Sequence, residues 1–228
     1  MTLKQDRIRK ILLNREKRFH SLCPPFVVQP NWVIVPDAKT GKRIGPVAEE
    51  LGLQMIQIFP GFTYGSGGNE LTRAALYEIP RLCAGLSREK ARILDLGCGS
   101  GILALACARL GFRKVEGMDI SLPALRQARA NSSANGLRVK WTSQVDLKQK
   151  YDLIIANLFG FLFLDYLPVF QKILAQNGRI YAAGFDHTQQ DELFERYESA
   201  GFERRGVQGP ITRWTQVEWI RKPSAQGK

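Results

Sequence analysis

From residue 91 onward, short apolar runs alternate with longer segments in which apolar residues recur every three or four positions. A short apolar run between glycine or polar residues predicts a buried strand, and the longer spacing predicts a helix with one buried face. Such an alternation is typical of a parallel sheet covered by helices. We expect strands at 91–96, 114–119, 137–142, 151–156 and 178–184, and helices at 101–110, 121–134, 159–174 and 188–200.

The C-terminal part breaks this alternation. Residues 202–208 and 214–221 are two short candidate strands on either side of Gly209-Pro210, a dipeptide that favours a turn. Two strands joined by a turn predict an antiparallel hairpin at the end of the sheet.

The segment before residue 60 carries shorter patterns. Apolar residues in 26–36 and 54–59 predict short strands, and Lys39-Thr40-Gly41-Lys42 predicts a turn between them. A glycine loop, Tyr64-Gly65-Ser66-Gly67-Gly68, follows. After it, Asn69 can cap a helix over 70–79 that ends near Pro80.

The run Asp95-Leu96-Gly97-Cys98-Gly99-Ser100-Gly101 lies between a predicted strand and a predicted helix, and Asp119 ends the next strand. Glycines let the chain turn sharply and bring backbone N–H groups close to a ligand. The following helix points its positive end toward that ligand. An acidic residue about 20 positions on can accept hydrogen bonds from both ribose hydroxyls. This unit predicts binding of a cofactor that contains a nucleoside.

The glycine spacing narrows the choice of cofactor. Dinucleotide-binding folds use G-x-G-x-x-G, whereas this chain has G-x-G-x-G with Asp95 two positions before the first glycine. That form resembles motif I of the class I S-adenosylmethionine (AdoMet) methyltransferases. The resemblance implies an α/β, Rossmann-like fold: a mostly parallel seven-stranded sheet, a terminal antiparallel hairpin and a small N-terminal extension.

A second polar signal is Ile155-Ala156-Asn157-Leu158, at the carboxyl end of the strand 151–156. Ligands bind at the carboxyl ends of strands in such sheets. The amide oxygen of Asn157 can hold the hydrogens of an amine and so aim its lone pair at a methyl donor. The alternative is a structural asparagine in a turn or cap. Phe159, Phe161 and Phe163 could wall the site, although aromatic stripes are more often core.

These motifs together resemble the ribosomal protein L11 methyltransferase family, whose members methylate protein amines. The resemblance implies that Asn157 orients the acceptor and that AdoMet is the cofactor, with no metal. Gly97, Gly99 and Gly101 would line the methionine and ribose, and Asp119 would bind the ribose. The cofactor contacts expected from the resemblance are Tyr64, Gly65, Gly67, Asp95, Gly97, Gly99, Gly101, Asp119, Ile120 and Asn157.

One departure from the family lies in the glycine loop. The family continues it with Thr-His-Pro-Thr-Thr, whereas this chain has Gly68-Asn69-Glu70-Leu71-Thr72 and only Thr72 matches. The sequence here is closer to the related electron-transfer-flavoprotein β-subunit lysine methyltransferases. We also expect the family's separate N-terminal substrate-recognition domain to be reduced. The resemblance therefore supports cofactor binding more strongly than the identity of the methylated protein.

Charge adds an expectation about partners. The net charge is +12, and residues 1–22 carry seven lysines or arginines against two acidic residues. Apolar positions in 3–19 have near-helical spacing, so we expect a basic amphipathic helix that either packs on the main domain or docks on RNA or a ribosome. The expected organisation is an arm over 1–24, a β-rich segment over 25–62, a methyltransferase domain over 63–222 and a tail over 223–228.

Composition favours a cytoplasmic enzyme without a membrane span, because the longest apolar stretch, 158–167, is short and contains Asp165. The four cysteines show no C-x-x-C spacing. The sequence thus predicts an AdoMet-dependent N-methyltransferase acting on a lysine or N-terminal amine of a protein, with a ribosomal protein as a candidate substrate. Two alternatives stay open: an RNA base N-methyltransferase, and a non-catalytic AdoMet-binding factor associated with ribosomes.

Overall fold

The computed structural model describes residues 25–28, 31–61, 69–206 and 214–222. Several predicted features lie outside them: the helix over 3–19, the loop Tyr64-Gly65-Ser66-Gly67-Gly68, the turn at Gly209-Pro210 and the tail. Within the described part of the chain, no helix has both the length and the apolar character needed to cross a membrane.

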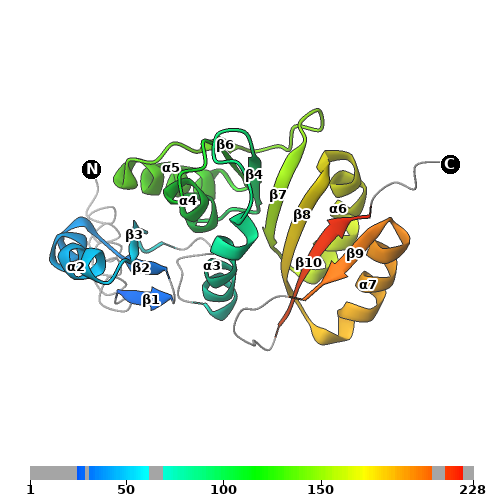
Figure 1. The fold of residues 1–228 in the computed structure, drawn as a ribbon, viewed down its shortest axis with the longest axis horizontal. Helices are drawn as coiled ribbons and strands as arrows, with labels where there is room; N and C mark the ends of the chain where they lie inside the picture. The colour runs from blue at the N-terminus through cyan, green and yellow to red at the C-terminus, as the bar shows by residue number, and fades with distance from the viewer. Residues whose placement is uncertain (1–24, 29–30, 62–68, 207–213, 223–228) are drawn as a thin grey trace, which may run out of the picture.

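A seven-stranded sheet forms the centre of the fold (Figure 1). Its strands are β4 (Arg92–Leu96), β5 (Lys114–Met118), β6 (Lys140–Thr142), β7 (Tyr151–Asn157), β8 (Leu174–Phe185), β9 (Phe202–Arg205) and β10 (Thr215–Arg221). Their spatial order is β6-β5-β4-β7-β8-β10-β9. The first five in this order run parallel, and β10 runs antiparallel to both β8 and β9. This arrangement confirms the predicted Rossmann-like sheet with its terminal hairpin.

Helices cover both faces of this sheet, as Figure 1 shows. They are α3 (Glu70–Cys83), α4 (Ile102–Arg109), α5 (Leu122–Asn135), α6 (Gly160–Ile173) and α7 (Gln190–Ser199), with a short 3₁₀ turn at His187–Gln189. Successive residues of a strand point to opposite faces. In β4, Ile93 therefore packs in the core under α3 and α4, whereas Leu94 packs in the core under α6 and α7.

A small second sheet lies beside α3 and α4 and consists of β1 (Phe26–Val28), β2 (Trp32–Val35) and β3 (Gln54–Gln57). Buried Trp32 donates its indole N–H to the carbonyl of Leu76 in α3 at 2.7 Å. Asn135 of α5 accepts from the N–H of Gln57 at 2.9 Å. These bonds fix the small sheet against the helices that carry the site.

The predicted turn at Lys39–Lys42 is wrong, because these residues lie in a helix, α2 (Ala38–Glu50), that joins β2 to β3. Asp37 caps its first turn by accepting from the N–H of Thr40 at 2.7 Å. Gly41, which suggested a turn, instead faces Val35 and Met55, where a small residue fits. The capping aspartate was the signal that sequence reasoning passed over.

The first helix of the large domain begins as predicted but ends later. Asn69 caps α3 by accepting from the N–H of Thr72 at 2.7 Å. The helix then continues through Pro80 to Cys83 rather than ending near the proline. Burial of Leu82 and Cys83 in the core stabilises the last turn, so tertiary packing outweighs the cost of the proline.

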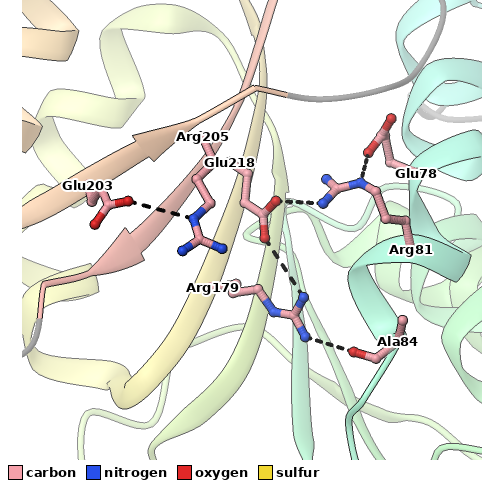
Figure 2. Close-up of polar contacts among 7 residues, drawn as sticks. All are labelled: Glu78, Arg81, Ala84, Arg179, Glu203, Arg205 and Glu218. Atoms are coloured by element: carbon pink, nitrogen blue, oxygen red, sulfur yellow. Dashed lines mark hydrogen bonds and ion pairs between the residues drawn. The ribbon is translucent and has the colours of Figure 1, made fainter.

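A buried ion-pair cluster joins α3 to the C-terminal hairpin (Figure 2). Arg81 contacts the carboxylates of Glu78 at 2.6 Å and Glu218 at 2.7 Å, and both glutamates are almost completely buried. Arg179 of β8 lies 3.9 Å from Glu218 and donates to the carbonyl of Ala84 at 3.1 Å. Burial lowers the pKa of Arg81, but its bonds to the two glutamates outweigh burial and raise it. The cluster therefore fixes β10 relative to α3.

Candidate active site

The loop after β4 has a backbone conformation that only glycine adopts readily. Gly97, Gly99 and Gly101 have φ angles of +72°, +51° and +82°. The N–H groups of Gly97 and Cys98 both donate to the carbonyl of Met118, at 2.8 and 2.9 Å. A Cβ atom on Gly97 would lie 2.3 Å from Leu158 Cδ2. The loop is thus held against the end of β5, with its backbone facing the cavity.

Asp119 follows β5 and holds the same loop. Its Oδ2 atom accepts from the N–H of Gly99 at 2.9 Å, and its Oδ1 atom accepts from the N–H of Ser121 at 2.8 Å. A carboxylate has about four lone-pair sites, so both oxygens keep capacity for ligand hydroxyls. Ile120, the next residue, is 79% exposed and lines the same cavity.

Asp95 is the buried acidic group of the site, with only 2% of its surface exposed. Its Oδ2 atom accepts from the N–H of Ala104 in the first turn of α4 at 3.0 Å. Burial raises the pKa of Asp95 to about 7, although the bond from Ala104 lowers it and the charge of Asp119 raises it. The carboxyl group is therefore close to its titration midpoint at neutral pH, and a nearby cation would favour its ionised form.

Asn157 is the last residue of β7, at the carboxyl edge of the sheet. The N–H of Leu158 donates to the carbonyl of Ala183 at 3.0 Å, which fixes the chain just after Asn157. Gly184, with a φ of +104°, lies against this turn. A Cβ atom there would be 2.3 Å from the Leu158 oxygen and 3.3 Å from Asn157 Oδ1. Gly184 therefore makes room for both the turn and the amide, a role that sequence reasoning missed.

These groups meet around one cavity of about 800 Å³, a volume within the usual range for small-molecule sites. Of the predicted residues, the structure brings Asp95, Gly97, Asp119, Ile120 and Asn157 to its wall. Gly99 and Gly101 shape the loop behind that wall. Further lining residues, not expected from the sequence, include Glu70, Leu71, Thr72, Met118, Leu162, Tyr166, Gly184 and Trp214.

The three phenylalanines after Asn157 separate into two roles. Phe159 lines the cavity, and its ring stacks on that of Phe161 with centroids 6.3 Å apart. These two residues are 56% and 61% exposed, whereas Phe163 is buried in the core. The cavity therefore has an apolar rim at the start of α6, next to Asn157. The predicted residues Tyr64, Gly65 and Gly67 lie outside the described residues, immediately before the capped start of α3.

Comparisons with known proteins show which family the chain resembles. Residues 17–223 match the family model described as "Ribosomal protein L11 methyltransferase (PrmA)". The curated ribosomal protein L11 methyltransferase of Lactobacillus johnsonii is 32% identical over 175 residues, 75% of this chain and 54% of that protein. The Thermus thermophilus protein of the same name is also 32% identical, over 88% of this chain and 70% of its own length.

A solved structure shows the same fold. The crystal structure of a ribosomal protein L11 methylase from Lactobacillus delbrueckii subsp. bulgaricus superposes with a TM-score of 0.72 at 26% identity. The superposition covers 87% of this chain and 97% of that one. The chain spans about half the length of the first curated relatives that it matches.

Proposed function

The chain belongs to the ribosomal protein L11 methyltransferase family, and from this premise we propose that it is an AdoMet-dependent N-methyltransferase. The acceptor is an amine of a protein, with a lysine of a ribosomal protein as the first candidate. The observation that carries the proposal is the convergence of the glycine loop, Asp119 and Asn157 on one cavity. A ribosomal substrate would place the activity in the cytoplasm.

The residues present fit the cofactor. Gly97 lines the cavity without a side chain of its own, and the positive φ angles of Gly97, Gly99 and Gly101 form the sharp turn that brings the loop backbone close to a ligand there. Asp119 keeps acceptor capacity for two ribose hydroxyls, and Ile120 offers an apolar surface beside it. AdoMet supplies a methyl group already activated by its sulfonium charge. The carboxyl of Asp95 lies in the wall of the same cavity and, once ionised, would complement that charge.

Asn157 is the residue that we assign to the acceptor. Its amide oxygen can accept a hydrogen bond from the incoming amine, which leaves the nitrogen lone pair free to point along the line of transfer. Because the methyl group is already activated, correct placement of the nucleophile supplies most of the acceleration. Gly184 and the Leu158–Ala183 hydrogen bond hold Asn157 in place for this task.

The amine must be neutral to react. Leu158, Phe159 and Leu162 line the cavity near Asn157 and give that part of the wall an apolar character. Burial against such a wall disfavours an ammonium charge and lowers the pKa of a lysine. A strong general base is therefore not required. The exposed pair of Phe159 and Phe161 would contact the aliphatic part of a protein substrate.

Two other functions remain as alternatives. The net charge of +12 favours an RNA base as acceptor, but Leu158-Phe159 follows Asn157 in place of the Pro-Pro-aromatic sequence that base N-methyltransferases often use to stack a flipped base. A non-catalytic AdoMet-binding factor is favoured by the altered residues Gly68 and Asn69. Recruitment to a ribosome through the basic residues 1–24 fits all three functions.

Incubation of the purified protein with methyl-labelled AdoMet and cell lysate, with and without ribonuclease, separates these possibilities. We expect label in a protein band that survives ribonuclease and resides on lysine or an N-terminal amine by mass spectrometry. Label that ribonuclease removes would support the RNA alternative. Calorimetric binding of AdoMet without any transfer would support the non-catalytic alternative.

A further inference from the structure

The parallel strands of the large sheet begin at the side opposite the cavity, and basic residues are concentrated there. We call this side of the sheet the basic edge. Strands β4, β5 and β6 run parallel and begin with Arg92, Lys114 and Lys140. Arg92 and Lys114 are direct neighbours in the strand register. Adjacent strands are only about 4.8 Å apart, so like charges here repel in the absence of a bound anion.

A hollow of about 830 Å³ opens at this edge. Six cationic side chains line it: Arg92, Arg113, Lys114, Arg129, Arg138 and Lys140. Its only acidic lining residue among those described is Glu116, which is paired with Lys140 at 3.1 Å. Arg113 pairs with Glu89 at 3.0 Å. The side chains of Arg92, Lys114 and Arg138 make no ion pair with any described carboxylate.

The basic edge continues beyond β4. Lys150 precedes β7, and β10, which runs antiparallel, ends here with Arg221 followed by Lys222 (Figure 1). These three cations line a second hollow of about 530 Å³, with no acidic residue in its described lining. The strand order places five strand spacings between β6 and β10, which is about 24 Å. A single small anion cannot span this distance, whereas an extended polyanion can.

We propose that this basic edge binds the phosphate backbone of RNA. A nucleic acid strand carries one phosphate per nucleotide, so an RNA strand laid along the edge would place several phosphates against it. Guanidinium groups pair with phosphates through two parallel hydrogen bonds, and four of the six cationic side chains that line the first hollow are arginines.

An acidic protein is a poorer match for the same edge. Protein partners usually anchor through buried aromatic or apolar side chains, and no described lining residue of either hollow is an exposed large hydrophobic. Trp141 is no such anchor, since its ring packs against Gly101 and Gly117. RNA bound at this edge leaves the cavity, at the opposite ends of the strands, open to a substrate.

Binding of a labelled single-stranded RNA of about 20 nucleotides, followed by fluorescence anisotropy over roughly 50 to 200 mM KCl, tests the proposal with the full chain. The edge variant combines Lys114→Gln, Arg138→Gln and Lys222→Gln, which are exposed residues far from the cavity lining. The control variant removes the same charge from α2 with Lys39→Gln, Lys42→Gln and Arg43→Gln, all exposed.

Each lost phosphate contact lowers the slope of log affinity against log salt by about 0.7 for single strands. We expect the edge variant to lose about 2 from this slope and at least about tenfold in affinity at low salt, whereas the control changes by less than about twofold. An equal loss in both variants, or RNA binding that salt does not weaken, would overturn the proposal. Polyglutamate that binds as tightly as RNA would assign the edge to acidic proteins instead.

Discussion

Asp119 accepts a hydrogen bond from the backbone N–H of Gly99 at 2.9 Å, across 20 residues of sequence. Its other oxygen is held by the N–H of Ser121. The side chain proposed to bind the ribose therefore also holds the glycine loop that would approach the rest of the cofactor. Loop geometry and ribose recognition depend on the same carboxylate.

Replacing Asp119 should weaken cofactor binding. Hydrogen bonds to a charged group contribute about 1.5–3 kcal/mol, so Asp119→Ala should reduce AdoMet affinity by roughly 10- to 150-fold in calorimetry. Asp191→Ala, an exposed acidic residue of α7, serves as the control and should leave the affinity unchanged. NAD should not bind to the unmodified protein. Unchanged AdoMet affinity in Asp119→Ala would remove this residue from the site.

AdoMet binding should depend on pH through Asp95. The pKa of this carboxyl is about 7 in the cofactor-free protein, and a sulfonium cation in the cavity would lower it. Binding would then release a proton, so AdoMet affinity should rise with pH through about 7, by at most tenfold per pH unit. S-adenosylhomocysteine lacks the sulfonium and should show a flatter profile in calorimetry.

The Asp95 carboxyl should also make the folded protein less stable as the pH rises, the opposite of its effect on AdoMet affinity. The folded state keeps a proton that an unfolded aspartic acid, with a pKa of about 3.9, has already released. The contribution of Asp95 to the free energy of unfolding is therefore fully present below about pH 4 and is lost as the pH rises to about 7. Asp95→Asn should flatten both profiles. A flat AdoMet profile in the unmodified protein would show that Asp95 is remote from the cofactor charge.

Gly184→Ala should disturb the turn that holds Asn157. Its φ of +104° disfavours alanine, and the new Cβ would lie 2.3 Å from the Leu158 oxygen. Together these effects should lower the free energy of unfolding by about 2 kcal/mol or more, measured by chemical denaturation. Gly45→Ala in α2, where a Cβ meets no atom within 4 Å, should instead stabilise by up to about 1 kcal/mol. Equal behaviour of the two variants would contradict this packing.

Arg81 should matter far more than an exposed arginine. Arg81→Ala leaves the buried carboxylates of Glu78 and Glu218 without their closest cation, and loss of one partner in a buried pair costs about 3 kcal/mol. Arg113→Ala breaks an exposed pair with Glu89 at 3.0 Å and should cost less than about 1 kcal/mol. Urea denaturation of both variants measures the difference. Similar small losses would show that the buried cluster contributes little.

The sequence predicted the sheet, its hairpin and the cofactor loop because strong local signals coincide there. The strand runs are rich in apolar residues, and Gly97 to Gly101 mark one sharp turn between strand and helix. Helix α2 was not predicted because Thr40 and Gly41 have a low helix propensity. The packing of Gly41 on Met55 decides the position of the helix. Helix α3 continues beyond Pro80 because of tertiary packing as well, since Leu82 is buried in the core.

Within the site, residues at strand ends were predictable and residues brought in by tertiary packing were not. Asp119 and Asn157 lie at the carboxyl ends of two predicted strands, so their position at the carboxyl edge followed from sheet geometry. Trp214 reaches the cavity from the hairpin, more than 50 residues after Asn157. Gly184 matters only because Leu158 packs against it. Neither relationship leaves a local pattern in the chain.

Methyl transfer by the unmodified protein and by Asn157→Ala, at saturating AdoMet and with purified ribosomal proteins, tests the proposed function most directly. We expect label on a protein amine with the unmodified protein, and at least about 100-fold slower transfer with Asn157→Ala, because misplacement of a reacting group costs about that much. The AdoMet dissociation constant should stay within about threefold. Full activity of Asn157→Ala, or no transfer by an unmodified protein that binds AdoMet, would contradict the assignment.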